Sequence, residues 1–200
     1  MQNPCLTAPP RRLITSVGNV ERQKMRSWKR AAAVLSAAAL MSLPALPAEA
    51  TTTFTFSNLH SGKCLEVAYA STANLADVGQ YTCHSLSNQK WYIQSAGGGW
   101  QALINVNSGK CLDVLDWSTA DFATVTQDTC DGGANQKWEL VQVVIGPGQP
   151  SNRMMLRNQN SGKCLEILNY STADFGEAVQ YSCYEGANQV WVSPQWWWPT

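Results

Sequence analysis

The 200-residue sequence is poor in charge, in histidine and in long apolar runs, and each shortage excludes a class of function. Charged residues make up 14% of the chain, and no stripe of Lys and Arg is present that would neutralise phosphates, so nucleic acid is not an expected partner. The two histidines, His60 and His84, are isolated, and we expect surface residues here, with no metal site and no nucleophile–His pair. The apolar run at residues 31–43 is shorter than the roughly 20 residues that a membrane-spanning helix needs.

The first fifty residues have the pattern of an export signal. A basic segment ending at Arg30 precedes the apolar run, and Ala48-Glu49-Ala50 follows it as an A-x-A cleavage site. The pattern predicts a presequence over residues 1–50, starting at Met1 or Met25, with cleavage after Ala50 and a secreted product. A membrane anchor kept in the mature protein is the alternative.

The expected mature chain, residues 51–200, is acidic and contains an even number of cysteines. It holds seven Lys and Arg against twelve Asp and Glu, a net charge of −5, which argues against anionic membranes as well as nucleic acid. Six of the seven cysteines lie in it, and only Cys5 lies in the presequence. An even number of cysteines in an exported domain predicts disulfides.

The same motif occurs three times, at residues 58–91, 105–138 and 158–191. Each copy contains two cysteines with the same spacing, which predicts the within-repeat disulfides Cys64–Cys83, Cys111–Cys130 and Cys164–Cys183. One repeat of this size cannot bury an apolar face alone. We therefore expect a single domain over residues 51–200, with repeats at about 54–100, 101–145 and 153–195 and a turn-rich insertion at 145–152.

Short alternating segments separated by Ser-Gly, Ser-Thr-Ala-Asn/Asp and Gly-Gly-Ala-Asn turns predict strands, and the mature chain shows no capped helical stripe. The predicted fold class is all-β with pseudo-threefold symmetry.

Alternation also predicts a site beside each disulfide. If Cys64 and Cys83 are bonded across a hairpin, Glu66 and Tyr81 share their face and should lie opposite each other. A carboxylate next to an aromatic ring suits sugar recognition, because the ring stacks on C–H groups while the carboxylate accepts hydrogen bonds from hydroxyls. Glu166 and Tyr181 repeat the pair.

In the second copy Asp113 should face Asp128, where two carboxylates repel and no ring remains. We therefore expect sugar at repeats one and three, and a weak, inactive or cation-bound site two. Trp117, in the loop after Asp113, is a possible substitute platform, with Tyr69 and Tyr170 expected at the equivalent positions.

The three S-G-K-C-L-[DE]-[VI] segments, the second cysteines and the three N-Q-x-W motifs resemble the ricin-B-type lectins, also described as family-13 carbohydrate-binding modules. The resemblance covers about residues 54–192. It implies a β-trefoil with a six-stranded barrel, a cap of three hairpins and a shallow glycan site in each repeat, often for galactose-containing or plant polysaccharide ligands. The implied ligand and support residues are Glu66, Tyr81, Asn88 and Gln89; Asp113, Asp128, Asn135 and Gln136; and Glu166, Tyr181, Asn188 and Gln189.

The chain departs from the family pattern at several positions. Glu replaces the usual Asp at positions 66 and 166, and the family's glutamine is replaced by Gly79, Thr126 and Val179. A turn glycine is replaced by large apolar residues, Leu75, Phe122 and Phe175, which either widen a binding surface or pack against the loop. Trp91, Trp138 and Trp191 are expected in the core, whereas at least one of Trp196, Trp197 and Trp198 should be exposed as a glycan platform or docking patch.

The resulting prediction is a secreted lectin without catalytic activity, metal or cofactor. An enzyme using Asp113 and Asp128 as a glycosidase pair is disfavoured, because a hairpin surface offers no cleft and the other repeats lack the pair. A protein-docking or inhibitor trefoil, or a glycan-targeting subunit of a separate glycoside hydrolase, are the alternatives.

Overall fold

The structure is a computed structural model that describes residues 52–143 and 152–193, all within the unit Pro47–Thr200. The predicted presequence, nearly all of the insertion at 145–152 and the three tryptophans at 196–198 lie outside the described residues. Within the described ranges, no helix is long and apolar enough to cross a membrane.

The described residues form twelve strands, four in each repeat, and five short 3-10 helices. Repeat one contains β1 (Ser57–Asn58), β2 (Cys64–Val67), η1 (Ala68–Ala70), β3 (Ala76–Tyr81), η2 (Ser87–Gln89) and β4 (Trp91–Gly97). Repeat two contains β5 (Trp100–Asn105), β6 (Cys111–Val114), η3 (Leu115–Trp117), β7 (Ala123–Asp128), η4 (Ala134–Gln136) and β8 (Trp138–Gln142). Repeat three contains β9 (Arg153–Asn158), β10 (Cys164–Ile167), η5 (Leu168–Tyr170), β11 (Gly176–Tyr181) and β12 (Trp191–Val192).

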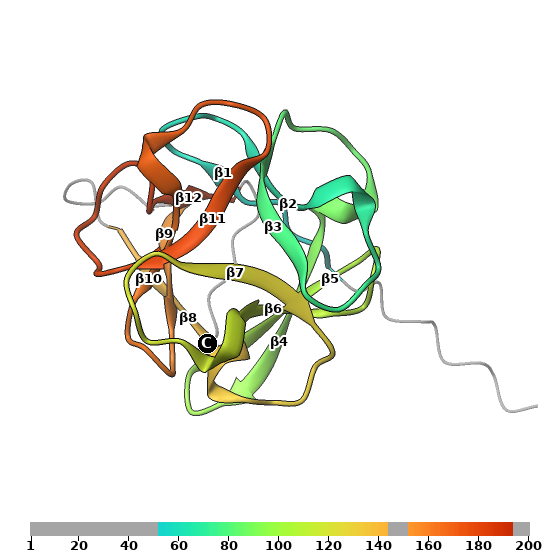
Figure 1. The fold of residues 1–200 in the computed structure, drawn as a ribbon, viewed down its shortest axis with the longest axis vertical. Helices are drawn as coiled ribbons and strands as arrows, with labels where there is room; N and C mark the ends of the chain where they lie inside the picture. The colour runs from blue at the N-terminus through green and yellow to red at the C-terminus, as the bar shows by residue number, and fades with distance from the viewer. Residues whose placement is uncertain (1–51, 144–151, 194–200) are drawn as a thin grey trace, which may run out of the picture. The chain divides into compact units, whose positions relative to one another are not determined.

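The first and last strands of the repeats form a barrel. Antiparallel pairing runs from β1 through β12, β9, β8 and β5 to β4, and a bridge between Phe54 and Trp91 closes the ring. The remaining strands form three hairpins, β2–β3, β6–β7 and β10–β11. Their second strands, β3, β7 and β11, pair with one another around the pseudo-threefold axis, as Figure 1 shows. The predicted all-β trefoil is confirmed.

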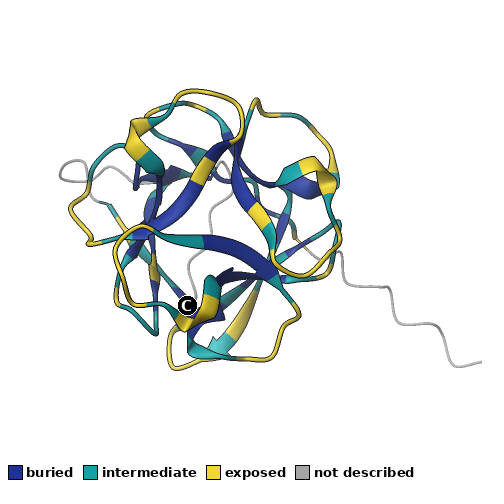
Figure 2. Cartoon of the chain, viewed as in Figure 1, coloured by how far each residue is buried: buried dark blue, intermediate teal, exposed yellow. Residues whose placement is uncertain are grey.

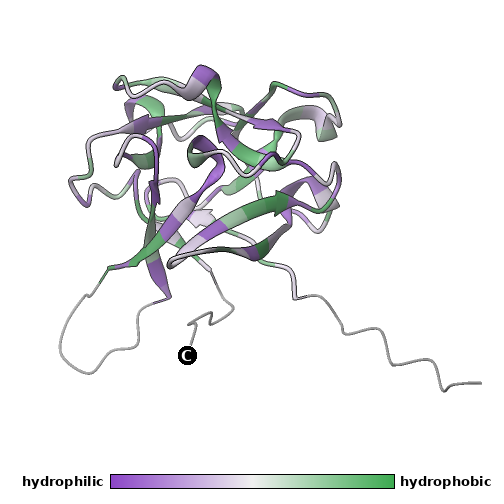
Figure 3. Ribbon diagram, turned by 90° about the horizontal axis from the view of Figure 1, so that it is seen from below, coloured by the Kyte–Doolittle hydropathy of each residue, from purple (hydrophilic) through white to green (hydrophobic). Residues whose placement is uncertain are grey.

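The three motif tryptophans fill the core where the barrel meets the cap. Trp91, Trp138 and Trp191 are fully buried, as predicted. Their indole Nε1 atoms donate to the backbone oxygens of Leu65, Leu112 and Leu165 at 3.0 to 3.2 Å, so each ring ties a barrel strand to a cap hairpin. Burial is concentrated on the strands and exposure on the outer loops (Figure 2), and the strands are banded with hydrophobic and hydrophilic residues (Figure 3).

Buried glutamines join neighbouring repeats in a cycle. The Gln80 Nε2 atom donates to the backbone oxygens of Ser171 and Ala173 at 2.8 and 3.0 Å, and its Oε1 atom accepts from the Ser61 hydroxyl. Gln127 holds the loop of repeat one in the same way, and Gln180 holds the loop of repeat two. The loop at residues 71–75, and its copies at 118–122 and 171–175, are therefore fixed by a different repeat from the one that supplies them.

Candidate functional site

All three predicted disulfides are present, with Cα atoms 5.0 to 5.1 Å apart. The predicted register beside them is wrong by two residues. Tyr81, and not Cys83, lies opposite Cys64, and Gly79 lies opposite Glu66. The reason is that β3 ends at Tyr81, so the disulfide joins a strand residue to a loop residue.

The same shift places Thr126 opposite Asp113 and Val179 opposite Glu166, so Asp113 does not face Asp128. A shift of two preserves the alternation of faces. Glu66 and Tyr81 therefore remain on one face as diagonal neighbours, which is still within reach of an aromatic side chain.

The three acids are buried side chains held by the predicted amides. Glu66 is 3% exposed, and its Oε2 atom accepts from Gln89 Nε2 at 2.9 Å and Asn88 Nδ2 at 3.3 Å. Gln89 is itself fixed, because it donates to the backbone oxygen of Thr82 and accepts from the backbone N–H of His84. In repeat three Gln189 holds Glu166 at 2.9 Å, and in repeat two Asn135 holds Asp113 at 2.8 Å.

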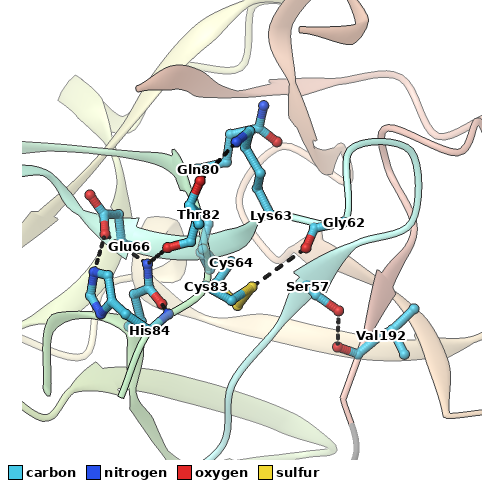
Figure 4. Close-up of a disulfide and its surroundings, with 12 residues drawn as sticks. Ser57, Gly62, Lys63, Cys64, Glu66, Gln80, Thr82, Cys83, His84 and Val192 are labelled. Atoms are coloured by element: carbon cyan, nitrogen blue, oxygen red, sulfur yellow. Dashed lines mark hydrogen bonds and ion pairs between the residues drawn. A yellow bond between two sulfur atoms is a disulfide. The ribbon is translucent and has the colours of Figure 1, made fainter. Parts of the chain in front are cut away.

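The residue after the second cysteine differs in each repeat and was not singled out as a site residue from the sequence. In repeat one it is His84, whose Nε2 atom lies 3.4 Å from Glu66 Oε2 (Figure 4). In repeat three it is Tyr184, whose hydroxyl donates to Asn188 Oδ1 at 2.8 Å. In repeat two it is Asp131, which places a further acid beside Asp113.

The amide oxygens next to the acids also differ between repeats. Asn88 Oδ1 and Asn135 Oδ1 are buried and accept no hydrogen bond from the described residues, whereas Asn188 Oδ1 has its partner in Tyr184. A buried acceptor without a donor costs about 1–3 kcal/mol and calls for an explanation, such as a bound hydroxyl. Repeats one and two therefore retain an acceptor that repeat three has already used.

Acidic surroundings distinguish repeat two. Burial raises the pKa of Asp113 from 3.8 to about 6, and repulsion from Asp128, Asp131 and Asp116 adds to this while hydrogen bonding from Gln136 opposes it. The described residues contain no group of three or more His, Cys, Asp or Glu side chains arranged to hold a metal ion. His60 is exposed and packs edge-on against Tyr170, with ring centroids 5.2 Å apart.

The aromatic side chains of the loops are not arranged as the sequence comparison assumed. Trp117 and Tyr170 are the last residues of η3 and η5, but Tyr69 is the middle residue of η1, so Ala70 is their equivalent. Tyr69 and Trp117 are 82% and 52% exposed. Repeat one therefore presents a ring one position earlier than the other two repeats.

Each hairpin also receives a residue from a neighbouring repeat. Phe175 of repeat three contacts Tyr81 of repeat one, with ring centroids 4.9 Å apart, and Phe122 of repeat two contacts Tyr181 of repeat three at 4.7 Å. In the sequence, the replacement of a turn glycine marks Phe122 and Phe175 as unusual. Which tyrosine each ring contacts is decided by how the three repeats close into the trefoil. Glu66, Tyr81, His84, Asn88 and Phe175 line one shallow hollow of about 360 Å³.

A closed six-stranded barrel with a cap of three hairpins defines a β-trefoil. The chain belongs to the family described as ricin-type beta-trefoil lectin domain-like, whose model matches residues 45–128, 88–148 and 134–196. No curated protein matches the chain.

Solved structures show the same fold. ThreeFoil, a designed 3-fold symmetric protein, is 40% identical, with a TM-score of 0.65 over 70% of this chain and 96% of its own. The exo-beta-1,3-galactanase 1,3Gal43A from Clostridium thermocellum is 36% identical, with a TM-score of 0.66 over 72% of this chain but only 30% of its own. The Macrolepiota procera ricin B-like lectin, solved in complex with lactose, shares the fold at 17% identity, with a TM-score of 0.61 over 74% of this chain and 98% of its own.

Proposed function

We propose that this protein is a secreted, non-catalytic lectin that binds neutral glycans at the hairpins of repeats one and three. The observation that carries the proposal is the arrangement repeated at Glu66/Tyr81 and Glu166/Tyr181. In each, a buried carboxylate held by a glutamine lies on the same face of a hairpin as a partly exposed tyrosine. The carboxylate accepts hydrogen bonds from sugar hydroxyls while the ring stacks on the C–H face of the pyranose.

The absence of such a ring in repeat two supports a weaker site there. Asp128 stands in the position of the tyrosines, so the hairpin of repeat two has no aromatic ring at this point of its face. Trp117 remains the candidate for a substitute platform, since it is 52% exposed.

Galactose-containing glycans or plant polysaccharides are the proposed ligands. The similarity to part of a galactanase and to a lectin solved with lactose supports this choice. The galactanase similarity, which spans only 30% of that enzyme, also favours a second role as a glycan-targeting partner of a separate glycoside hydrolase. The three disulfides and the predicted signal that ends at Ala50 support secretion.

A glycan and polysaccharide screen of the purified protein tests the proposal, with Tyr81→Ala/Tyr181→Ala measured beside the parent. We expect the double variant to lose at least about fivefold in affinity at each site, because each ring supplies stacking worth about 1 kcal/mol or more. Tyr92→Ala, on the barrel strand β4, is the matched control and should bind like the parent. Binding that survives the double change would move the site to Trp117 or to the C-terminal tryptophans, and no binding to any glycan would favour a protein partner.

A further inference from the structure

Three large apolar residues occupy a backbone conformation that ordinarily favours glycine. Leu75, Phe122 and Phe175 have φ of 60°, 63° and 62°, and they are 55%, 54% and 47% exposed. A left-handed backbone costs a residue with a side chain about 1–2 kcal/mol, and such strain persists mainly at functional sites. These exposed side chains add no stability to the hydrophobic core, so we expect their role at the surface.

Phe175 is held rigidly over repeat one. Its backbone N–H donates to the backbone oxygen of Gln80 at 2.8 Å, and the Gln80 side chain holds the preceding residues of the loop. Asp174 adds an ion pair to Lys63 at 2.6 Å and accepts from the backbone N–H of Thr82 at 2.8 Å. These contacts fix the backbone that carries the ring before any ligand arrives, which reduces the entropic cost of binding.

The Phe175 ring joins two tyrosines of repeat one into a continuous aromatic surface. Phe175 stacks on Tyr69 with ring centroids 4.9 Å apart and an interplanar angle of 25°, and it lies against Tyr81 at 4.9 Å and 56°. The three rings are therefore contiguous, and the middle one belongs to repeat three. Repeat three has Asn169 where repeat one has Tyr69, so it lacks the same three-ring set.

A second hollow adjoins the first across these rings. It measures about 350 Å³ and shares Glu66, Tyr69 and Phe175 with the hollow beside Tyr81. Ala68, Asp77, Gly79 and Glu177 line its other sides. Gly79 is required there, because a Cβ atom at this position would lie 2.6 Å from the backbone oxygen of Gly176. Gly79 lies directly opposite Glu66 in the hairpin, so the residue that faces the acid contributes no side chain to this hollow.

We propose that repeat one binds a neutral oligosaccharide of at least two pyranose units, and that Phe175 is the specificity-determining residue for the second unit. This inference rests on the proposed lectin function. One unit occupies the hollow beside Tyr81, and the next crosses Phe175 and Tyr69 into the adjoining hollow. The carboxylates of Asp77 and Glu177 accept hydrogen bonds from the hydroxyls of the second unit. Together with Glu66 they disfavour sugars that carry carboxylate or sulfate groups.

Site one is isolated by working in a Tyr181→Ala background. Calorimetry compares galactose and xylose with their β-linked di- and trisaccharides. We expect the trisaccharide of one series to bind at least about tenfold tighter than its monosaccharide, and Phe175→Gly to reduce that ratio to about threefold or less. Glycine is unstrained at this φ, so the loop should hold, and thermal unfolding verifies it.

Leu75→Gly is the matched control, because it removes an apolar side chain and the same backbone strain beside repeat two. It should leave the ratio unchanged. A ratio that survives Phe175→Gly, or a parent that binds monosaccharide and trisaccharide equally, overturns this inference and leaves the lectin function standing. A parent that binds neither series overturns the proposed ligands as well.

Discussion

Replacing Asp113 by asparagine tests how much the free energy of unfolding is lowered by burying a carboxyl group near other acidic side chains in repeat two. The carboxyl has a pKa of about 6 in the folded protein against 3.8 for an unperturbed aspartate. Well below pH 3.8 it is protonated in both the folded and the unfolded chain, so its charge does not affect stability. Between pH 4 and 6 the unfolded chain loses this proton first, and the folded protein becomes progressively less stable.

The magnitude follows from the shift. A change of this size corresponds to at most about 3 kcal/mol. Burial is its largest cause, and because the smaller repulsion from the exposed Asp116 and Asp131 is screened by solvent, we expect about 1–2 kcal/mol. Asp113→Asn cannot ionise and keeps an acceptor for Asn135 Nδ2. We therefore expect the variant to gain about 1–2 kcal/mol at pH 8, a rise in melting temperature of about 3–6 °C, and less than about 0.5 kcal/mol at pH 4.

Thermal unfolding of the parent and Asp113→Asn from pH 4 to pH 8 measures this difference. Asp116→Asn is the control, because its exposed side chain should change stability by less than about 0.5 kcal/mol. If Asp113→Asn is destabilised at pH 8 but not at pH 4, the carboxylate is stabilising in its charged form and the reasoning from its burial fails. Equal destabilisation at both ends of the pH range would assign the effect to a cause other than this charge.

Two further outcomes are expected. Gln180→Ala should lower the free energy of unfolding by about 2–4 kcal/mol in chemical denaturation, because the Ser118 and Ala120 carbonyls lose their buried donor, whereas Gln94→Ala on the exposed face of β4 should change little. An unchanged midpoint would show that the loops do not depend on this clamp. Burial raises the pKa of Glu166, so glycan affinity in a Tyr81→Ala background should fall as pH drops through that raised pKa, when the protonated acid loses acceptor capacity. Glu166→Gln should abolish this pH dependence, and its persistence would assign it to another group.

Identical spacing in three copies was sufficient to predict the three disulfides and an all-β domain with pseudo-threefold symmetry, and the resemblance to the ricin-B-type lectins implied the trefoil. The register beside Cys64 was not predictable in the same way. A disulfide constrains the distance between two residues, but it does not show whether both lie in strands, and Cys83 lies beyond the end of β3. Alternation still placed Glu66 and Tyr81 on one face, because a slip of two residues preserves parity.

Contacts between repeats could not be found by comparing the repeats with one another. The exposed Phe175 and the glycine at position 79 were visible as departures from a pattern, but their meaning depends on which segments the closed fold brings together. The same holds for Tyr184, whose hydrogen bond to Asn188 distinguishes repeat three from repeat one. Sequence symmetry predicts what the repeats share, and the differences between them required the three-dimensional arrangement.

The cyclic exchange of loops has a consequence for how such a protein can diverge after duplication. Each repeat supplies the tyrosine or aspartate of its own hairpin and the loop residue at position 75, 122 or 175 that packs beside another hairpin. A change at Phe175 therefore alters the surface around Tyr81. A repeat taken alone would have a hairpin without the loop residue that packs beside it, and a loop residue without the hairpin that it contacts. The smallest unit that contains one complete copy of the surface is therefore the closed ring of three, and no repeat can vary without altering its neighbour.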